Sequence, residues 1–305
     1  MIVIIVPVHN RWELTRKFLQ SLQQQTFQEY KIVIVNDCSN DETSKALKND
    51  FPFVDEIKTS KEEWWTGSIN AGCEHAINTY KDMEFIIIAN NDLVVAEKTV
   101  ETLYKYAKGN QDTIIGSITR EYDNNDALYD GACQIDWLPF KCHQLQVNDN
   151  GLMFNNVDVL NGRFTIIPRQ VFEKVNFNAD KFPHYLGDLD FFLRAKNAGY
   201  RLALCCDAIC FDTGGVSGFH ALKKDHGITR FIRTQFSIAS HENFIIFLRF
   251  LMQNAPSAKL KFYNITRRFR IFLVRLILAV AYSIFYPFIY MLFIFRKHKQ
   301  PSSRN

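Results

Sequence analysis

The stretch FIIIANND, residues 85–92, decides the fold of this chain. Its first five residues form a short, continuous apolar run, which is typical of a strand buried on both faces. Such strands belong to parallel sheets that helices cover from both sides. In these sheets, ligands bind beyond the carboxyl ends of the strands. The polar residues at positions 90–92 are therefore candidates for a binding site.

Two earlier stretches repeat this pattern. The strand-forming runs Ile2–Val6 and Lys31–Val35 are followed by the polar segments PVHNR, residues 7–11, and NDCSND, residues 36–41. Because the carboxyl ends of parallel strands meet at one edge of a sheet, we expect these segments to converge with residues 90–92. Turns and helix caps are the alternative explanation, since Asn, Asp and Ser also favour turns.

The remaining pattern predicts an α/β fold with a mixed, mainly parallel sheet flanked by helices. Predicted helices cover 12–25, 41–47, 68–80, 187–198 and most of 231–252, and further strands are predicted at 54–58, 201–204 and 208–211. Gly199 is a typical helix end. Between residues 120 and 160 the alternation is lost, which predicts a loop-rich or antiparallel insertion.

The last part of the chain differs in character. Residues 276–295 contain no charge and are long enough to cross a bilayer, with Pro287 expected to kink the helix. Both flanks are basic, so the positive-inside rule does not decide an orientation. A spanning helix, a re-entrant or interfacial helix and a buried core helix remain open. We expect a globular domain at 1–250 and a membrane-associating segment at 251–305.

Composition excludes some classes of function. A net charge of +4 in 305 residues, with no basic tract in the first 250, argues against nucleic-acid binding. Seven scattered cysteines without metal-ligand spacing predict free thiols in a reducing cytosol. The apolar N-terminus is too short for a signal peptide and has no basic start, so we expect the globular part to face the cytosol.

Several motifs together resemble a known family. IVPVHNR (5–11), VIVNDCSNDET (33–43) and FIIIANND are similar, in order and spacing, to family-2 glycosyltransferases with the GT-A fold. WWTGSINAG (64–72), NGRFTIIPRQVFEKV (161–175) and FPHYLGDLDFFLRAKNAGY (182–200) resemble the bacterial rhamnosyltransferase-like subgroup of surface polysaccharide enzymes. The resemblance covers about residues 1–250. It implies transfer of a sugar from a nucleotide-diphosphate sugar to a saccharide acceptor.

Such a transfer needs a donor pocket, a divalent cation at the leaving diphosphate and a general base. The resemblance places the nucleotide beside the first two polar segments, most firmly at Pro7 and Asp37, while helix capping is an alternative role for Asp41. The full set of predicted donor-binding residues is Pro7, His9, Asn10, Arg11, Asp37, Trp65, Asn70, Asn91 and Arg163.

The predicted cofactor is Mg²⁺ or Mn²⁺, held mainly by Asp92 because Asn90 replaces the first acid of the family's Asp-x-Asp motif. His220 is the favoured second ligand, with Asp212 as the alternative. Asp188 is the predicted base, although Gly187 stands where the family often has another acid. Asp190 is expected to pair with Arg194 four residues later.

Two adjacent tryptophans, Trp64 and Trp65, precede the small residues Thr66 and Gly67. In the GT-A fold this segment crosses the donor site before the Asp-x-Asp strand. We expect Trp65 to face the sugar and Trp64 to pack in the core, with packing of both rings as the alternative. Thr66 and Gly67 would let the backbone approach the donor closely.

The resulting hypothesis is a metal-dependent, inverting glycosyltransferase. The basic and apolar C-terminus suggests a lipid-linked acceptor, as in O-antigen or capsule assembly, at the cytoplasmic face of the inner membrane. A nucleotidyltransferase is the second class, but PVHNRWELT carries no glycine-rich phosphate loop. The third is a catalytically weak, membrane-bound sugar-nucleotide-binding module, supported by Gly187 and Asn90. The sugar, its nucleotide and the linkage are not predicted.

Overall fold

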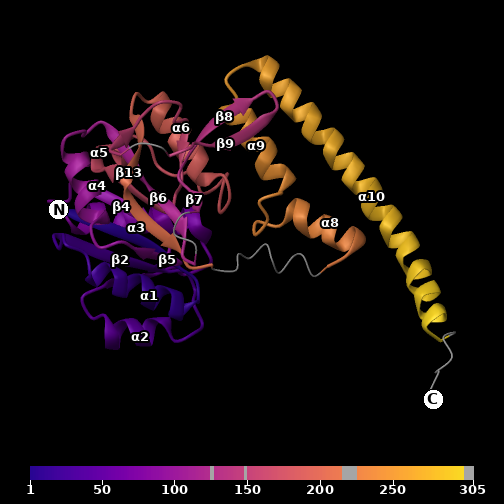
Figure 1. The fold of residues 1–305 in the computed structure, drawn as a ribbon, viewed down its shortest axis with the longest axis horizontal. Coiled ribbons are helices and arrows are strands. Elements are labelled where there is room, and N and C mark those ends of the chain that lie inside the picture. The colour runs from indigo at the N-terminus through magenta and orange to yellow at the C-terminus, as the bar shows by residue number, and fades with distance from the viewer. Residues whose placement is uncertain (124–126, 148–149, 215–224, 299–305) are drawn as a thin grey trace. The chain divides into compact units, whose positions relative to one another are not determined.

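The computed structural model describes residues 1–123, 127–147, 150–214 and 225–298. The chain divides into two compact units, Met1–Gly215 and Val216–Asn305, which we describe separately. The first unit is a mixed sheet with helices on both faces (Figure 1), so the predicted α/β class is confirmed. The predicted boundary at residue 250, between a glycosyltransferase-like domain and a membrane-associating segment, stays a prediction.

The main sheet follows the order β10-β13-β6-β12-β4-β1-β2-β3, with β5 paired to β13 and β7 to β6. β1 pairs in parallel with β2 and β4, and β2 with β3, whereas β12 runs antiparallel between β4 and β6. The strands are β1 (Ile2–Val8), β2 (Tyr30–Asn36), β3 (Asp55–Lys58), β4 (Phe85–Ala89), β5 (Leu93–Val95), β6 (Thr113–Glu121), β7 (Leu128–Asp130), β10 (Leu152–Met153), β12 (Phe164–Pro168) and β13 (Arg201–Asp212).

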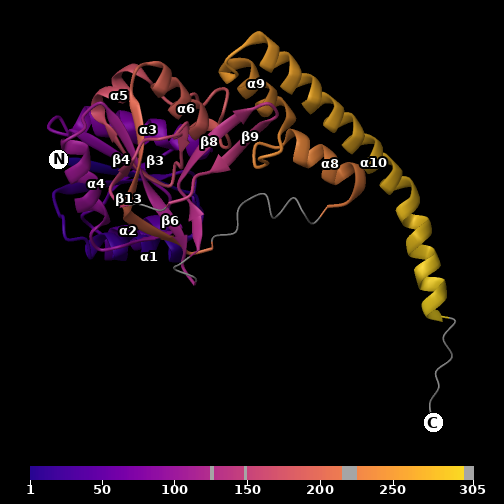
Figure 2. The ribbon, with the colours of Figure 1, turned by 45° about the horizontal axis from the view of Figure 1, so that its top comes forward.

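A smaller antiparallel sheet joins β11 (Val159–Leu160), β8 (Ala132–Trp137) and β9 (Phe140–Gln144). Figure 2 shows β8 and β9 as a two-stranded ribbon beside the main sheet. This sheet occupies the stretch where the strand–helix alternation is lost, which confirms the predicted antiparallel insertion.

Two apolar cores lie on the two faces of the main sheet, because neighbouring residues of a strand point to opposite sides. In β1, Val3 and Ile5 enter one core with α3, α5 and α6, whereas Ile2 and Ile4 enter the other with α1, α2 and α4. The helices are α1 (Trp12–Gln23), α2 (Thr43–Asp50), α3 (Trp64–Thr79), α4 (Thr99–Lys108), α5 (Arg169–Lys174) and α6 (Gly187–Asn197).

Most predicted elements of the first unit are present, with two differences. α3 begins at Trp64 and not at Ser68, because Asp37 caps it there. β13 is one strand where two were predicted, because a register shift between Cys205 and Ile209 lets it continue along β6. The predicted helix end is confirmed by Gly199, whose φ of 95° suits glycine. All seven cysteines lie in the described residues and are free.

The second unit contains α8 (Gly227–Phe236), α9 (Phe244–Asn254) and α10 (Ala258–His298), so the helix predicted at 231–252 is divided into two. Phe272 of α10 packs against Phe231 of α8 and Phe244 of α9, with ring centroids 5.1 and 4.4 Å apart. Glu242 accepts hydrogen bonds from Arg268, through its backbone carbonyl, and from Arg275, through its carboxylate.

The segment Ala258–Tyr286 of α10 is, among the described residues, the one helix long and apolar enough to cross a membrane. Its mean hydropathy reaches 1.8, and several of its apolar side chains are exposed, including Ile277 at 66% and Leu278 at 62%. The helix runs on to His298 (Figure 2). This segment is therefore not a buried core helix of the second unit.

A close contact between α3 and the sheet gives a first prediction. A Cβ atom at Gly72 would lie 2.3 Å from Cγ2 of Ile5 and 2.8 Å from Cγ2 of Val35. We expect Gly72→Ala to lower the free energy of unfolding by about 1–3 kcal/mol, because the helix must move off the sheet. Chemical denaturation of the purified protein measures this change.

The matched control is Gly109→Ala, which adds the same methyl group at the end of α4. There the nearest atom, the carbonyl oxygen of Tyr106, lies 3.7 Å away, which is an ordinary contact. Equal stability of the two variants would contradict the close packing of α3 on β1 and β2.

Candidate active site

The first two polar segments meet at the carboxyl edge of the sheet, as predicted. The backbone N–H of Asn10 donates to Ser39 Oγ at 2.8 Å, and the N–H of Asn40 donates to Asn10 Oδ1 at 2.8 Å. Asn10 has a φ of 59° and Cys38 one of 55°, in the left-handed region where short polar residues are most often tolerated. These bonds fix the two loops as one surface.

Asp41 works as a cap, which was the alternative role considered for it. Its Oδ1 atom accepts from the N–H and the hydroxyl of Thr43 in the first turn of α2. Its Oδ2 atom accepts the N–H of Trp12 at 3.1 Å, at the start of α1. Hydrogen bonds from these groups hold the pKa of Asp41 below its ordinary value, although burial opposes them. One carboxylate therefore begins two helices.

Asp37 explains why α3 begins at the tryptophan pair. Its carboxylate accepts the backbone N–H groups of Glu63 at 2.8 Å and Trp64 at 2.9 Å, and the hydroxyl of Thr59 at 2.7 Å. These are the unpaired donors that the first turn of a helix presents. The cap comes from the end of β2, far from the helix in sequence. A contact between Asp37 and the donor stays a prediction.

Trp65 joins three parts of the site. Its indole N–H donates to Oδ1 of Asn90 at 2.9 Å, directly after β4. A Cβ atom at Gly162 would lie 2.9 Å from the ring of Trp65 and 3.2 Å from Cβ of Asp188. The edge of the Trp65 ring also packs against Phe177 of the core. Trp65 thus contacts the core and lies beside Gly162, which is also next to Asp188.

Arg163 lies among three carboxylates at the same edge. Its Nη1 donates to Oδ2 of Asp212 and lies 3.9 Å from Oδ1 of Asp92, and its Nε lies 3.8 Å from Oδ2 of Asp130. The guanidinium also covers the ring of Tyr129, with 4.7 Å from Cζ to the ring centre. Only 18% of the Arg163 side chain is exposed.

The carboxylate of Asp92 fits the predicted metal role. Its Oδ1 atom is buried and accepts no hydrogen bond from the described residues. Burial raises its pKa above the ordinary value, while Arg163 lowers it and Asp212 raises it further. A buried carboxylate oxygen without a donor is costly, and a hard divalent cation would relieve that cost.

The second metal ligand is not identified. His220, the favoured candidate, lies outside the described residues. Asp212, the alternative, is described and binds Arg163. Within the described residues, no three His, Cys, Asp or Glu side chains are arranged to hold a metal ion. Of the two described candidates, Asp92 has an oxygen without a hydrogen-bond partner, whereas Asp212 is already bonded to Arg163.

Asp188 begins α6 at a half-buried position next to Gly162. Burial raises its pKa to about 6, the N–H of Leu189 opposes the shift, and the charge of Asp130 adds to it. Gly187 has a packing reason, since a Cβ atom there would lie 2.3 Å from Oγ1 of Thr66 in α3. The missing acid at position 187 is therefore a consequence of the contact between α3 and α6.

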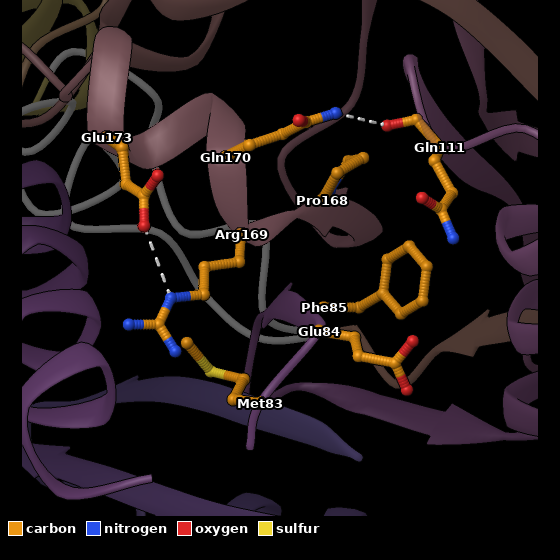
Figure 3. A pocket seen from close by; sticks show the side chains of 8 residues that line it. All are labelled: Met83, Glu84, Phe85, Gln111, Pro168, Arg169, Gln170 and Glu173. Carbon is orange, nitrogen blue, oxygen red and sulfur yellow. Dashed lines mark hydrogen bonds and ion pairs between the residues drawn. The ribbon is translucent and has the colours of Figure 1, made fainter. Parts of the chain in front are cut away.

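A separate pocket lies at the opposite edge of the sheet, beside Phe85 at the start of β4 (Figure 3). Its polar groups already have partners: Arg169 binds Glu173 and the carbonyl of Lys81, and Glu84 binds Lys108. Ligands of parallel sheets bind at the carboxyl ends of the strands. The candidate site is thus the edge with Asp92 and not this pocket.

Comparison with known families agrees with this geometry. The family model described as "Glycosyl transferase family 2" matches residues 3–175, more than half of the chain. The chain belongs to glycosyl transferase family 2. The resemblance drawn from the motifs is thereby confirmed.

Relatives of this family 2 chain include bacterial glycosyltransferases. It is 24% identical over 289 residues to the O-antigen chain rhamnosyltransferase RfbN of Salmonella typhimurium, covering 84% of this chain and 82% of the relative. It is 23% identical over 185 residues to the glycosyltransferase GlyG of Streptococcus pneumoniae, covering 58% and 60%. The match to the GalNAc(5)-diNAcBac-PP-undecaprenol beta-1,3-glucosyltransferase of Campylobacter jejuni is 26% over 126 residues, covering 40% and 39%.

A solved structure shares the fold. The family 2 chain is similar to GalNAc-T7, crystallised with UDP, GalNAc and Mn²⁺, with a TM-score of 0.58 and 14% identity. The alignment covers 93% of this chain and 57% of GalNAc-T7. At this identity the likeness shows the GT-A fold alone, which confirms the predicted fold class.

Some predicted donor-binding residues of this family 2 chain do not join the group around Asp92. The side chain of Asn70 exchanges hydrogen bonds with both backbone groups of Phe177, and that of Asn91 donates to Thr15 of α1 at 2.9 Å. Pro7 lies within β1 beside Val35, one strand away from β4. Nδ1 of His9 contacts the carbonyl oxygen of Asp37 at 2.6 Å.

Sequence reasoning missed three residues of the site. Asp130 and Tyr129 end β7, in the insertion whose strands could not be aligned with the sheet from the sequence. His184 lies in the loop before α6, its ring 5.4 Å from that of Trp64. Burial and the charge of Arg11 lower the pKa of His184 to about 4, and its Nδ1 has no partner among the described residues. An uncharged imidazole thus faces the loops predicted for the donor.

The raised pKa of Asp188 gives a second prediction. Since its folded pKa of about 6 exceeds the ordinary 3.8, the folded state binds the proton more tightly. This contribution to stability is present at low pH and is lost as the pH rises from about 4 to about 6. We expect Asp188→Asn to stabilise the protein by about 1–3 kcal/mol at pH 8 and by little at pH 4.

Thermal or chemical unfolding at the two pH values measures the effect. Asp180→Asn is the matched control, because Asp180 is exposed on the approach to α6 and its charge is not buried. The same stabilisation at pH 4 and pH 8 would contradict a buried charge as the cause.

Proposed function

We propose that this chain is a metal-dependent, inverting glycosyltransferase that uses a nucleotide-diphosphate sugar. One observation carries the proposal: Asp92, with its unpartnered buried oxygen, and Asp188, with its raised pKa, lie at the same edge of a family 2 sheet. The contacts of Trp65 and Gly162 connect the two. The carboxylate of Asp92 is suited to bind a cation, and that of Asp188 is suited to accept a proton.

Asp188 acts as the general base on the acceptor hydroxyl. A pKa of about 6 leaves the carboxylate ionised at neutral pH and makes it more basic than an ordinary aspartate. The acceptor oxygen then attacks the anomeric carbon from the side opposite the leaving diphosphate. The activity should therefore rise with pH through about 6.

The departing nucleoside diphosphate is stabilised near Asp92. A divalent cation bound there supplies positive charge to the phosphates. The ring of Trp65 and the neutral imidazole of His184 shape the donor side of the site, and aromatic rings suit the apolar faces of sugars. The Mn²⁺ and UDP named for GalNAc-T7 support this arrangement in the same fold.

The acceptor we propose is a lipid-linked saccharide at the cytoplasmic face of the inner membrane. The names of two relatives, an O-antigen chain rhamnosyltransferase and an undecaprenol-linked glucosyltransferase, support this class of acceptor. The exposed apolar side chains of α10 and the exposed Arg267 and Arg270 support contact with an anionic membrane.

The alternative is a sugar-nucleotide-binding module without catalysis, and it was supported by Gly187 and Asn90. Gly187 is explained by its contact with Thr66 and needs no loss of catalysis. The amide of Asn90 accepts the N–H of Trp65, so it has a structural task at the position where the family has an acid.

The donor and the two carboxylates can be tested together by donor hydrolysis. Purified protein with Mg²⁺ or Mn²⁺ is offered a panel of UDP-, GDP- and dTDP-sugars, with water as a slow substitute acceptor. We expect release of one nucleotide, dependent on metal, and a loss of about 10²-fold or more in Asp92→Asn and Asp188→Asn. The wild-type rate should rise through pH 6 with a single apparent pKa.

Asp180→Asn is again the control and should retain full activity, because Asp180 is exposed. If nucleotide binds but no donor is hydrolysed with or without a saccharide-lipid acceptor, the binding module is the better explanation. If hydrolysis survives in Asp188→Asn with the pH profile of the wild type, Asp188 is not the base.

Membrane contact is tested by co-sedimentation with vesicles of neutral or anionic lipid. We expect binding to anionic vesicles, weakened by salt, and largely lost in the double variant Ile277→Glu, Leu278→Glu, because buried charge opposes insertion. Phe53→Glu changes a similarly exposed apolar residue of the first unit and should bind normally. Equal binding by all three proteins would place membrane contact elsewhere.

A further inference from the structure

Arg163 is a cation that lies among the carboxylates of the described site. Its guanidinium donates to Asp212 and lies within 4 Å of Asp92 and Asp130. The exposed fractions of the Asp92 and Asp212 side chains are 14% and 8%. Three carboxylates lie around this one guanidinium, and Arg11 is a second cation whose charge acts on Asp92. The carboxylates thus outnumber the cations, and water screens such buried groups poorly.

The two carboxylates nearest to Arg163 Nη1 are not equally satisfied. Asp212 accepts a hydrogen bond from it, whereas Oδ1 of Asp92 lies 3.9 Å away and accepts none from the described residues. Oδ1 of Asp92 thus has only a distant charge near it and is open to a better partner. A divalent cation would balance the excess charge, but the position beside Asp92 lies next to the guanidinium.

The backbone of Arg163 is fixed while its side chain is long. Its carbonyl accepts the N–H of Asn90 at 2.8 Å, and its N–H donates to Oδ1 of Asn161 at 3.2 Å. The planar guanidinium can bind a phosphate through two parallel hydrogen bonds. Such a pair of bonds is stronger than the present contact with Asp92, in which nitrogen and oxygen are 3.9 Å apart. A diphosphate at this edge is therefore a better partner for Arg163 than Asp92 is.

We propose that Arg163 and a divalent cation compete for Asp92 and Asp212, and that a bound nucleoside diphosphate ends the competition by taking the guanidinium. The inference rests on the proposed function and assigns Arg163 a positioning role in it. The cation alone then binds the protein weakly. It binds the protein–nucleotide complex far more tightly, and the nucleotide likewise binds the protein–cation complex more tightly than the protein alone.

The test is titration of the purified full chain with Mn²⁺ alone, and with Mn²⁺ in the presence of UDP, GDP or dTDP. Arg163→Gln removes the competing charge. We expect Mn²⁺ alone to bind the variant about tenfold more tightly than the wild type, and the gain from adding nucleotide to fall by a similar factor.

Arg169→Gln is the matched control, since Arg169 also pairs with a carboxylate, Glu173, but lies at the opposite edge of the sheet (Figure 3). It changes the net charge equally and should bind Mn²⁺ as the wild type does. A comparable change in both arginine variants would overturn the competition in favour of a general effect of charge.

Arg163→Gln could fail to fold, because it removes the guanidinium around which three carboxylates lie. Tyr129→Leu avoids this risk: Tyr129 is 46% exposed, and its loss removes the ring under the guanidinium without changing any charge. We expect Mn²⁺ alone to bind this variant about two- to fivefold more tightly. Tyr122→Leu, at a tyrosine of similar exposure, is the control and should show no change.

Failure of the inference differs from failure of the proposed function. If the wild type binds Mn²⁺ with nucleotide, but Mn²⁺ alone binds equally to the wild type and to folded Arg163 and Tyr129 variants, the competition is wrong and metal dependence stands. If no form binds Mn²⁺ with any nucleotide that itself binds, both the metal role of Asp92 and the competition are wrong.

Discussion

The candidate site depends on one carboxylate that caps a helix from another part of the chain. Asp37, at the end of β2, accepts the first N–H groups of α3 and so sets where that helix begins. From that point Trp65 reaches Asn90 after β4, and the N–H of Thr66 donates to the carbonyl of Pro183 before α6. The two halves of the site are therefore positioned relative to each other by the start of α3.

The same constraint marks the limit of what the sequence could predict. The apolar runs placed β1, β2 and β4 closely, because a buried strand has a local signature, and they placed the polar segments on one edge. The start of α3 was wrong, because its cap lies 26 residues earlier in the chain. The helical pattern alone became clear only at Ser68, after the tryptophans, and a distant cap leaves no mark in a local window.

The charges of the site show the same division. Asp92 and Asp188 could be named from their positions after a strand and before a helix. Asp212, at the end of β13, could be named only as an alternative metal ligand, and its contact with Arg163 was not predicted. Asp130, at the end of β7, could not be placed at the site at all. Only the pairing of β7 with β6, and of β6 with β13, brings them together. Net charge and spacing along the chain carry no information on such a cluster.

The contact between Thr66 and Gly187 has a consequence for how such chains can diverge. A side chain at position 187 and a full threonine at position 66 would occupy the same space, since the two atoms would be 2.3 Å apart. A side chain at 187 therefore requires a change nearby: a relative with an acid at 187 has to carry a smaller residue at 66, or a first helical turn of α3 shifted away from α6. Correlated substitution at these two positions would record the packing of α3 against α6 in sequences alone.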